Sequence, residues 1–213
     1  MPTTLDRSHS VRMLLNAIEK AMMNNPVRSA IQRHFEAERL LKMGGPMGSG
    51  VALELGCGRG VGAEIILDRF GARRVDAFDL DPDMIDRARR RLAPRGDRVR
   101  LWVGDGTAID AKDETYDAVF DFGIIHHIPD WRLALREVHR VLRKGGRFYV
   151  EEVLAAFIHH PVWRTLLDHP MNDRFDRDTF AAGLREVGFE VRASREMLGQ
   201  FAWFIAEKAC FAG

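Results

Sequence analysis

From residue 51 onward, the sequence alternates between short apolar runs typical of buried strands and periodic runs typical of helices. Strand-like runs are expected at 51–55, 73–80, 98–105, 116–123, 146–153, 189–196 and 200–208, and helices at 62–70, 81–92, 130–146 and 176–188. Asp81 and Asp130 stand where side chains cap helices, and Pro82 occupies a first helical position. This alternation predicts an α/β fold with a mainly parallel sheet and helices on both faces. Ligands of such sheets bind beyond the C-terminal ends of the strands.

The first 48 residues read as a separate helical segment. Residues 10–24 place apolar side chains at helical spacing, namely Val11, Leu14, Leu15, Ile18 and Met22. A second helix is expected at 24–43, with Asn25 as its cap, and the glycine-rich stretch 44–50 then acts as a linker. We therefore predict two units, a helical cover at 1–48 and a ligand-binding domain at 49–213.

The cover carries several basic residues against its apolar face: Arg12, Lys20, Arg28, Arg33, Arg39 and Lys42. A basic amphipathic helix can lie on a membrane surface. Glu19, Glu36 and Glu38 dilute this charge, so we favour a lid over the ligand site. If the inner face of the lid is apolar, the substrate is expected to be apolar too.

Charge and cysteine content narrow the function classes. The chain has 32 basic and 31 acidic residues, which argues against a nucleic-acid partner. Its two cysteines, Cys57 and Cys210, do not form a disulfide framework, and no apolar run is long enough to span a membrane, so we expect a cytoplasmic protein. No metal is expected, because the spacing of His159, His160 and His169 matches no recognised site and no cysteine joins them.

The stretch "LELGCGRGVGA" lies where the first expected strand hands over to the first helix of the α/β part. Glycines there let a ligand approach main-chain amides and the helix N-terminus. Gly58, Gly60 and Ala63 match the dinucleotide fingerprint G-x-G-x-x-G/A, and Asp79 follows 19 residues after Gly60. A nicotinamide dinucleotide therefore remains open at this point.

Glu54, two residues before Gly56, helps to distinguish a nicotinamide dinucleotide from other cofactors. A carboxylate at this position repels a pyrophosphate and suits a cationic ligand. S-adenosylmethionine carries a sulfonium and an ammonium and has no phosphate. The sequence resembles the class I S-adenosylmethionine-dependent methyltransferases, whose first motif is an acidic residue followed by G-x-G-x-G; here these residues are Glu54, Gly56, Gly58 and Gly60.

The resemblance continues along the chain, and "GIIHHIPD" at 123–130 is similar to a pattern found after the fourth strand of many small-molecule methyltransferases. It implies a seven-stranded sheet whose last strand is antiparallel. It also implies that Asp79 binds the ribose, that Leu80 packs on the adenine, and that Asp105 lies near the adenine amine. The cofactor-binding residues expected from it are Glu54, Gly56, Cys57, Gly58, Gly60, Asp79, Leu80, Asp105, Gly106 and Phe122.

Catalytic residues are harder to assign, because methyl transfer needs a general base only if the attacking atom must lose a proton. His126 and His127 follow the fourth strand, where the acceptor would meet the methyl group, and are our candidates. Glu151 and Glu152 end the fifth strand on opposite faces, so one of them is expected to face the pocket, and we favour an ion pair as their role. The irregular segment 157–176 suits a substrate lid.

We expect S-adenosylmethionine-dependent methyl transfer to a small-molecule acceptor. The first alternative is an NAD(P)-binding oxidoreductase, although neither Tyr116 nor Tyr149 begins the Tyr-x-x-x-Lys pair of short-chain dehydrogenases. The second is a non-catalytic S-adenosylmethionine-binding regulator. Amino-methylating DNA enzymes are disfavoured, because Asp121-Phe122-Gly123 replaces their Asn/Asp-Pro-Pro-aromatic sequence.

Overall fold

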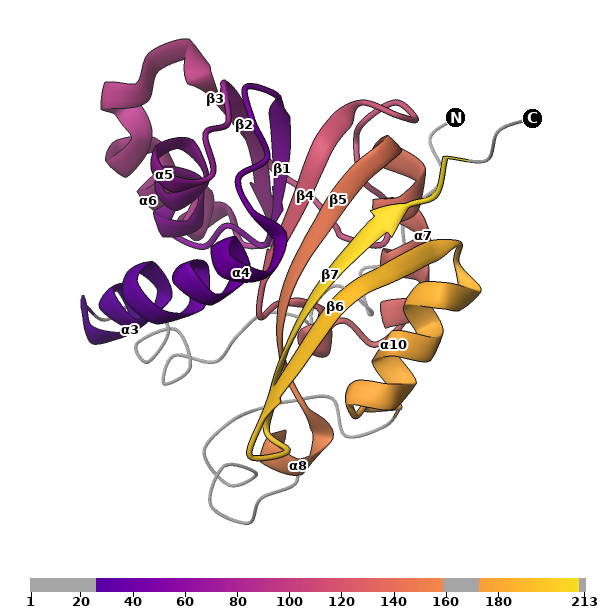
Figure 1. Cartoon of the computed structure of the whole chain (residues 1–213). Coiled ribbons are helices and arrows are strands. Elements are labelled where there is room, and N and C mark those ends of the chain that lie inside the picture. The colour runs from indigo at the N-terminus through magenta and orange to yellow at the C-terminus, as the bar shows by residue number, and fades with distance from the viewer. Residues whose placement is uncertain (1–25, 159–172, 211–213) are drawn as a thin grey trace, which may run out of the picture.

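The computed structural model describes residues 26–158 and 173–210, which form a seven-stranded sheet flanked by helices (Figure 1). The order of the strands is β3-β2-β1-β4-β5-β7-β6. Their bounds are β1 Val51–Leu55, β2 Arg74–Asp79, β3 Val99–Val103, β4 Tyr116–Phe122, β5 Leu142–Val153, β6 Phe189–Met197 and β7 Phe201–Lys208. β7 runs antiparallel to both of its neighbours, and the pairs from β3 to β5 are parallel. The predicted fold class and the antiparallel last strand are thus confirmed.

Helices cover both faces of the sheet (Figure 1). The helical segments are α3 Pro26–Ile31, the π-helix η1 Gln32–Glu36, α4 Ala37–Gly44, α5 Val61–Arg69, α6 Pro82–Leu92, η2 Ala93–Arg98, η3 Ile125–His127, α7 Trp131–Val141, α8 Ala155–Ile158 and α10 Arg177–Glu186. Leu40, Ile66 and Ile85 bring α4, α5 and α6 into one apolar cluster, while Trp131 and Phe180 bring α7 and α10 into the cluster on the other face. The predicted N-caps Asp81 and Asp130 accept main-chain N–H bonds as expected.

The helix expected at 130–146 was predicted too long, since α7 ends at Val141. Leu142 has an extended backbone, and its N–H closes the last helical turn on the carbonyl of Val138. Leu142 then pairs with Tyr116, so β5 begins four residues earlier than the expected 146. The charged residues at 143–144 are typical of a helix C-terminus, which is why the helix was predicted to continue through them. Pairing of β5 with β4 makes the backbone extended here instead.

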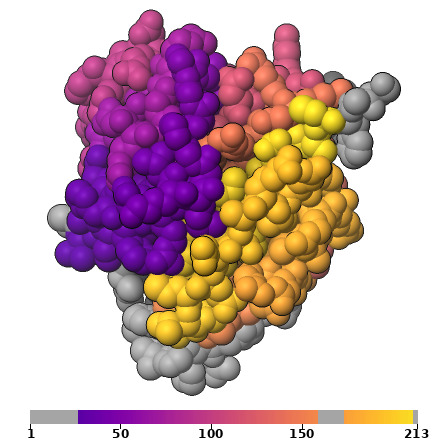
Figure 2. Space-filling view, viewed as in Figure 1, coloured from indigo at the N-terminus to yellow at the C-terminus, as the bar shows by residue number. Residues whose placement is uncertain are grey.

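The helix expected at 24–43 is also not uniform, because the π-helix η1 separates α3 from α4. η1 and α4 pack against β7: the ring centroid of Phe35 in η1 lies 6.1 Å from that of Trp203, and the guanidinium of Arg39 in α4 stacks 4.3 Å from the centroid of the Trp203 ring. In the space-filling view the indigo N-terminal residues accordingly lie against the yellow strands (Figure 2). Across the described residues, no helix combines the length and apolar content needed to cross a membrane.

Several expectations fall on residues 1–25 and 159–172, outside the described part of the chain. They concern the first helix of the cover, with Leu14 and Met22 on its apolar face, and the segment containing His159, His160 and His169. The division into a cover and a ligand-binding domain likewise stays a prediction.

Gly58 and Gly60 provide a matched test of packing at the turn after β1. Both have positive φ, 51° and 85°, but a Cβ at Gly60 would lie 2.7 Å from Leu92 Cδ1, whereas a Cβ at Gly58 would meet nothing within 4 Å. We expect Gly58→Ala to lower the free energy of unfolding by about 1–2 kcal/mol through backbone strain alone. Gly60→Ala should lose a further 1–3 kcal/mol, roughly, through overlap with α6. Urea denaturation measures both, and equal losses would contradict this account.

Candidate functional site

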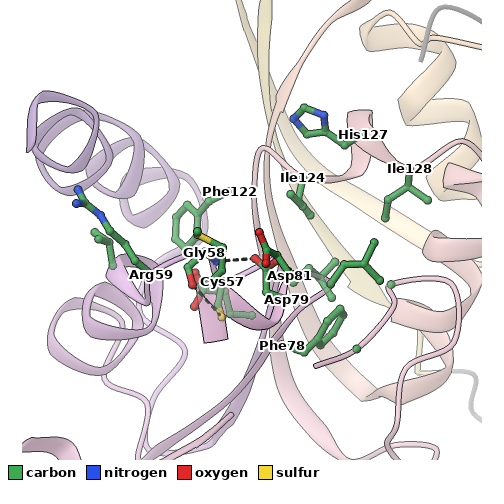
Figure 3. Close-up of a pocket in the computed structure, with 18 of the residues that line it drawn as sticks. Cys57, Gly58, Arg59, Phe78, Asp79, Asp81, Phe122, Ile124, His127 and Ile128 are labelled. Atoms are coloured by element: carbon green, nitrogen blue, oxygen red, sulfur yellow. Dashed lines mark hydrogen bonds between the residues drawn. The ribbon is translucent and has the colours of Figure 1, made fainter. Parts of the chain in front are cut away.

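A cavity opens at the C-terminal edge of the parallel strands, where β1, β2 and β4 end (Figure 3). Ten residues expected at the site lie in its wall: Glu54, Gly56, Cys57, Gly58, Asp79, Leu80, Asp105, Gly106, Phe122 and His127. They come from the ends of several different elements, so the fold brings together most of the residues singled out in the sequence.

Gly60 and His126 were expected at the site, but the structure does not place them in the cavity wall. Gly60 precedes α5 in a left-handed conformation and packs against Leu92 and Ala88 of α6. A glycine is needed there because this backbone conformation and this close packing both exclude a side chain. His126 is buried behind the wall, with 3% of its surface exposed.

Hydrogen bonds tie the glycine turn to the end of β2. The N–H of Gly58 donates to Asp79 Oδ2 at 2.8 Å (Figure 3). The N–H of Cys57 donates to the carbonyl of Phe78 at 2.8 Å. Asp79 Oδ1 accepts the N–H of Asp81 at 2.9 Å. The Asp79 carboxylate is therefore held rigidly at the cavity, beside main chain that carries no side chain at Gly58.

Glu54 is a buried carboxyl group of the cavity wall that is only partly compensated by hydrogen bonds. Its side chain is 2% exposed, and Oε2 has no hydrogen-bond partner among the described residues. Burial, and then the charge of Asp79, raises the pKa of Glu54 well above its usual range. A Cβ on Gly62 would lie only 1.9 Å from Glu54 Oε1, so a glycine is required behind the carboxyl group. A cationic group in the cavity would compensate both carboxylates, whereas a pyrophosphate would be repelled.

The rest of the wall combines apolar side chains with a second carboxylate that is fixed by hydrogen bonds, that of Asp105. Asp105 Oδ1 accepts hydrogen bonds from the N–H and the hydroxyl of Thr107, each at 2.8 Å. The apolar part of the wall includes Leu55, Val61, Phe78, Leu80, Met84, Phe122, Ile124 and Ile128. This combination suits a flat, partly polar group such as a nucleoside base.

The N-terminal helical segment contributes three wall residues that were not predicted from the sequence, namely Arg28, Ser29 and Gln32. Arg28 donates from Nη1 to both carboxylate oxygens of Glu36, at 2.6 and 2.5 Å, and Arg59 Nη2 donates to Ser29 Oγ at 2.5 Å. Helical spacing showed only that this segment is amphipathic. The contact with the cavity depends on how the segment docks.

Behind the cavity, the ends of β4 and β5 carry a cluster of buried side chains. His126 Nδ1 lies 2.7 Å from Glu152 Oε2, a contact that is an ion pair only when the imidazole carries a second proton, so the expected ion pair stays a prediction. Burial raises the pKa of Glu152 to about 7. Burial, and then the charge of Glu152, raises the pKa of Asp121 well above its usual range. Glu151 points to the other side, toward Arg28 and Glu36, and burial also raises its pKa. Neither glutamate lines the cavity.

Residues 52–146 match the model of a family described as "Methyltransferase domain". A protein of Mycolicibacterium smegmatis named as a probable S-adenosylmethionine-dependent methyltransferase is 34% identical over 153 residues, covering 70% of this chain and 54% of that protein. A fatty-acid O-methyltransferase of the same organism is 34% identical over 120 residues, covering 56% of this chain and 43% of its own length. The chain thus spans about half the length of the curated relatives that it matches.

Among solved structures, a SAM-dependent methyltransferase from Aquifex aeolicus superposes with a TM-score of 0.71 at 18% identity, covering 90% of this chain and 97% of that one. At this identity the similarity establishes the fold.

The buried carboxyl groups lead to a prediction about stability. The folded protein holds protons on Glu54, on Glu151 and on the Asp121–Glu152 pair at pH values where the unfolded chain has released them. The free energy of unfolding must therefore fall as pH rises through this range. We expect the melting temperature to fall between about pH 5 and pH 7. The contribution of Glu152 to this fall is lost as the pH rises through its pKa of about 7. His139, whose pKa is lowered by burial, opposes this trend at the acidic end.

Thermal melts at constant ionic strength measure this dependence. Glu54→Gln should make the slope shallower, because it removes one such carboxyl group. Glu38→Gln is the control, since the Glu38 side chain is partly exposed and its pKa is lowered by Arg69 and Lys42, so it stays ionised throughout. A melting temperature that rises with pH across the whole range would contradict the assignment.

Proposed function

The chain belongs to the class I S-adenosylmethionine-dependent methyltransferases, and from this premise we propose that it transfers a methyl group from S-adenosylmethionine to a small, apolar acceptor. The observation that carries the proposal is the Glu54 carboxyl group, which is buried beside Asp79 at a glycine turn and has one oxygen with no hydrogen-bond partner among the described residues. The charge of Asp79 disfavours ionisation of Glu54, and a cationic, phosphate-free cofactor would compensate it.

In this proposal, different wall residues bind different parts of S-adenosylmethionine. Glu54 and the main chain at Gly56 and Gly58 would hold the amino-acid part, and Asp79 would accept the ribose hydroxyls. Leu80 would pack on the adenine, and Asp105 would accept from its amine. The positive φ of Gly56 and Gly58, 55° and 51°, supports this assignment. A residue with a side chain would be strained in this backbone conformation, whereas glycine adopts it freely and lets a ligand approach the main-chain amides.

When bound, S-adenosylmethionine supplies an electrophilic methyl group whose transfer requires an acceptor aligned with the carbon–sulfur bond. The chain's own contribution is alignment and exclusion of water, which Phe122, Ile124 and Ile128 would provide from the apolar wall. His127, also in the wall, would take a proton from an acceptor that must lose one.

The apolar wall and one relative support an apolar acceptor. Residues from β1, β2, β4 and the turn after β4 contribute hydrophobic side chains to the cavity. One relative at 34% identity is named a fatty-acid O-methyltransferase. We therefore propose a small apolar molecule carrying a nucleophilic oxygen or a similar group.

Thermal melting with S-adenosylhomocysteine, and separately with NADH, tests the cofactor. At a hundred times its dissociation constant a ligand adds about 2.7 kcal/mol of stability, which corresponds to a rise of roughly 5 °C or more. We expect this rise with S-adenosylhomocysteine alone. Asp79→Asn should reduce it, and the control Asp110→Asn, which changes an exposed carboxylate outside the cavity wall, should not.

A methyl-transfer assay completes this experiment, with labelled S-adenosylmethionine as donor and hexadecanoate as the first acceptor probe. Binding of S-adenosylhomocysteine without transfer to any apolar acceptor would favour a non-catalytic binding protein. A rise with NADH alone would overturn the proposal in favour of a nicotinamide-dependent oxidoreductase.

A further inference from the structure

The short turn η3, Ile125–His127, is attached to the end of β5 by one side chain. Glu152 Oε1 accepts the N–H of Ile125 at 2.6 Å and that of His126 at 3.2 Å. Its Oε2 lies 2.7 Å from His126 Nδ1 and accepts the N–H of Val153 at 3.0 Å. Three main-chain N–H groups and His126 Nδ1 thus converge on one fully buried carboxyl group, and with the ring proton on Nδ1 these four donors satisfy both of its oxygens.

A second buried carboxyl group holds the start of the same turn. Asp121, at the end of β4, accepts the N–H of Ile124 at 2.9 Å through Oδ1. Its Oδ2 has no donor among the described residues, and its raised pKa favours a proton that makes it a hydrogen-bond donor to Glu152. Arg174 encloses the cluster, donating from Nη1 to the carbonyl of His126. The groups facing Glu152 are therefore Asp121, His126 and Arg174.

This anchored turn carries residues into the cavity wall. Ile124, His127 and Ile128 line the cavity, whereas His126 and Glu152 do not (Figure 3). The His126 and His127 rings lie 4.1 Å apart, centroid to centroid. A displacement of the turn would therefore move His127 directly.

We propose that Glu152 and His126 are positioning residues, which fix the turn so that His127 faces the methyl acceptor. In this arrangement His126 acts only as an N–H donor from Nδ1, and no proton passes through it during the reaction. The kinetic part of this inference rests on the proposed methyl transfer; the structural part does not.

Two pairs of variants of the full chain test it. Glutamine at position 152 replaces one acceptor oxygen with an NH2 group that faces two of the four N–H donors, so Glu152→Gln should loosen the turn. Glu151→Gln is the matched control, since it makes the same change at a neighbouring buried carboxyl group that points away from the turn. His126→Asn keeps a donor near the position of Nδ1, and His126→Ala removes it.

Two readouts are needed, one of which requires no acceptor. Hydrogen exchange of the main-chain N–H groups of Ile125 and His126 should become at least about tenfold faster in Glu152→Gln and His126→Ala, but not in Glu151→Gln or His126→Asn. The same two variants should lose at least about tenfold in kcat, with the KM for S-adenosylmethionine changed much less. Calorimetric binding of S-adenosylhomocysteine confirms that each variant retains a folded site.

The outcomes separate this inference from the proposed function. If His126→Asn loses as much kcat as His126→Ala, His126 takes part in the chemistry and the inference is wrong. Unchanged exchange and kcat in Glu152→Gln would also overturn it. If the wild type binds S-adenosylhomocysteine but methylates no acceptor, the proposed function fails, and hydrogen exchange alone decides whether Glu152 holds the turn. Should Glu152→Gln not fold, the His126 pair gives the same decision.

Discussion

The parallel strands of this sheet all end at one edge, and three of them place fully buried carboxyl groups there. Glu54, Asp121 and Glu152 are each the last residue but one of their strands, β1, β4 and β5. A buried carboxylate is costly unless it is protonated, hydrogen-bonded or paired with a cation. The architecture of the site follows from how each of these groups is compensated.

The buried carboxyl groups at this edge of the sheet fall into two regions, which differ in how fully their oxygens are hydrogen-bonded. Asp121 and Glu152 accept main-chain N–H groups from the turn after β4, which makes that turn rigid. Glu54 has one oxygen with no hydrogen-bond partner in the part of the chain that the structure describes, and it lies beside Asp79 at the glycine turn. The first region holds the structure of the wall in place, and the second is the region that we propose for the cofactor.

The N-terminal helical segment connects this edge to the last strands. Its residue Arg28 lines the cavity while bonded to Glu36, and Arg39 stacks on Trp203 of β7. Since β7 pairs with β5, the segment contacts both the cavity wall and the part of the sheet from which Glu152 emerges. This arrangement explains how a segment outside the matched range 52–146 contributes to the wall.

The strands, the helices and most of the cavity wall could be predicted from the sequence, because the signals for them lie close together along the chain. The period of the apolar residues gave the strands and helices, and Asp81 and Asp130 marked two helix starts. The prediction failed where distant partners determine the outcome. Leu142 is extended because it pairs with Tyr116, and His126 is turned away from the cavity by Glu152, 26 residues further along the chain. Adjacent histidines look equivalent in a sequence, and only this contact distinguishes His126 from His127.

The central claim is that the buried carboxyl group of Glu54 receives the cationic part of the cofactor. Calorimetric titration with S-adenosylhomocysteine at neutral pH, in two buffers of different ionisation enthalpy, measures the protons exchanged on binding. An arriving ammonium group stabilises the ionised form of Glu54, so we predict that binding releases protons and that Glu54→Gln reduces this release and weakens binding. Binding with no proton release, and with the same affinity in Glu54→Gln, would contradict the account.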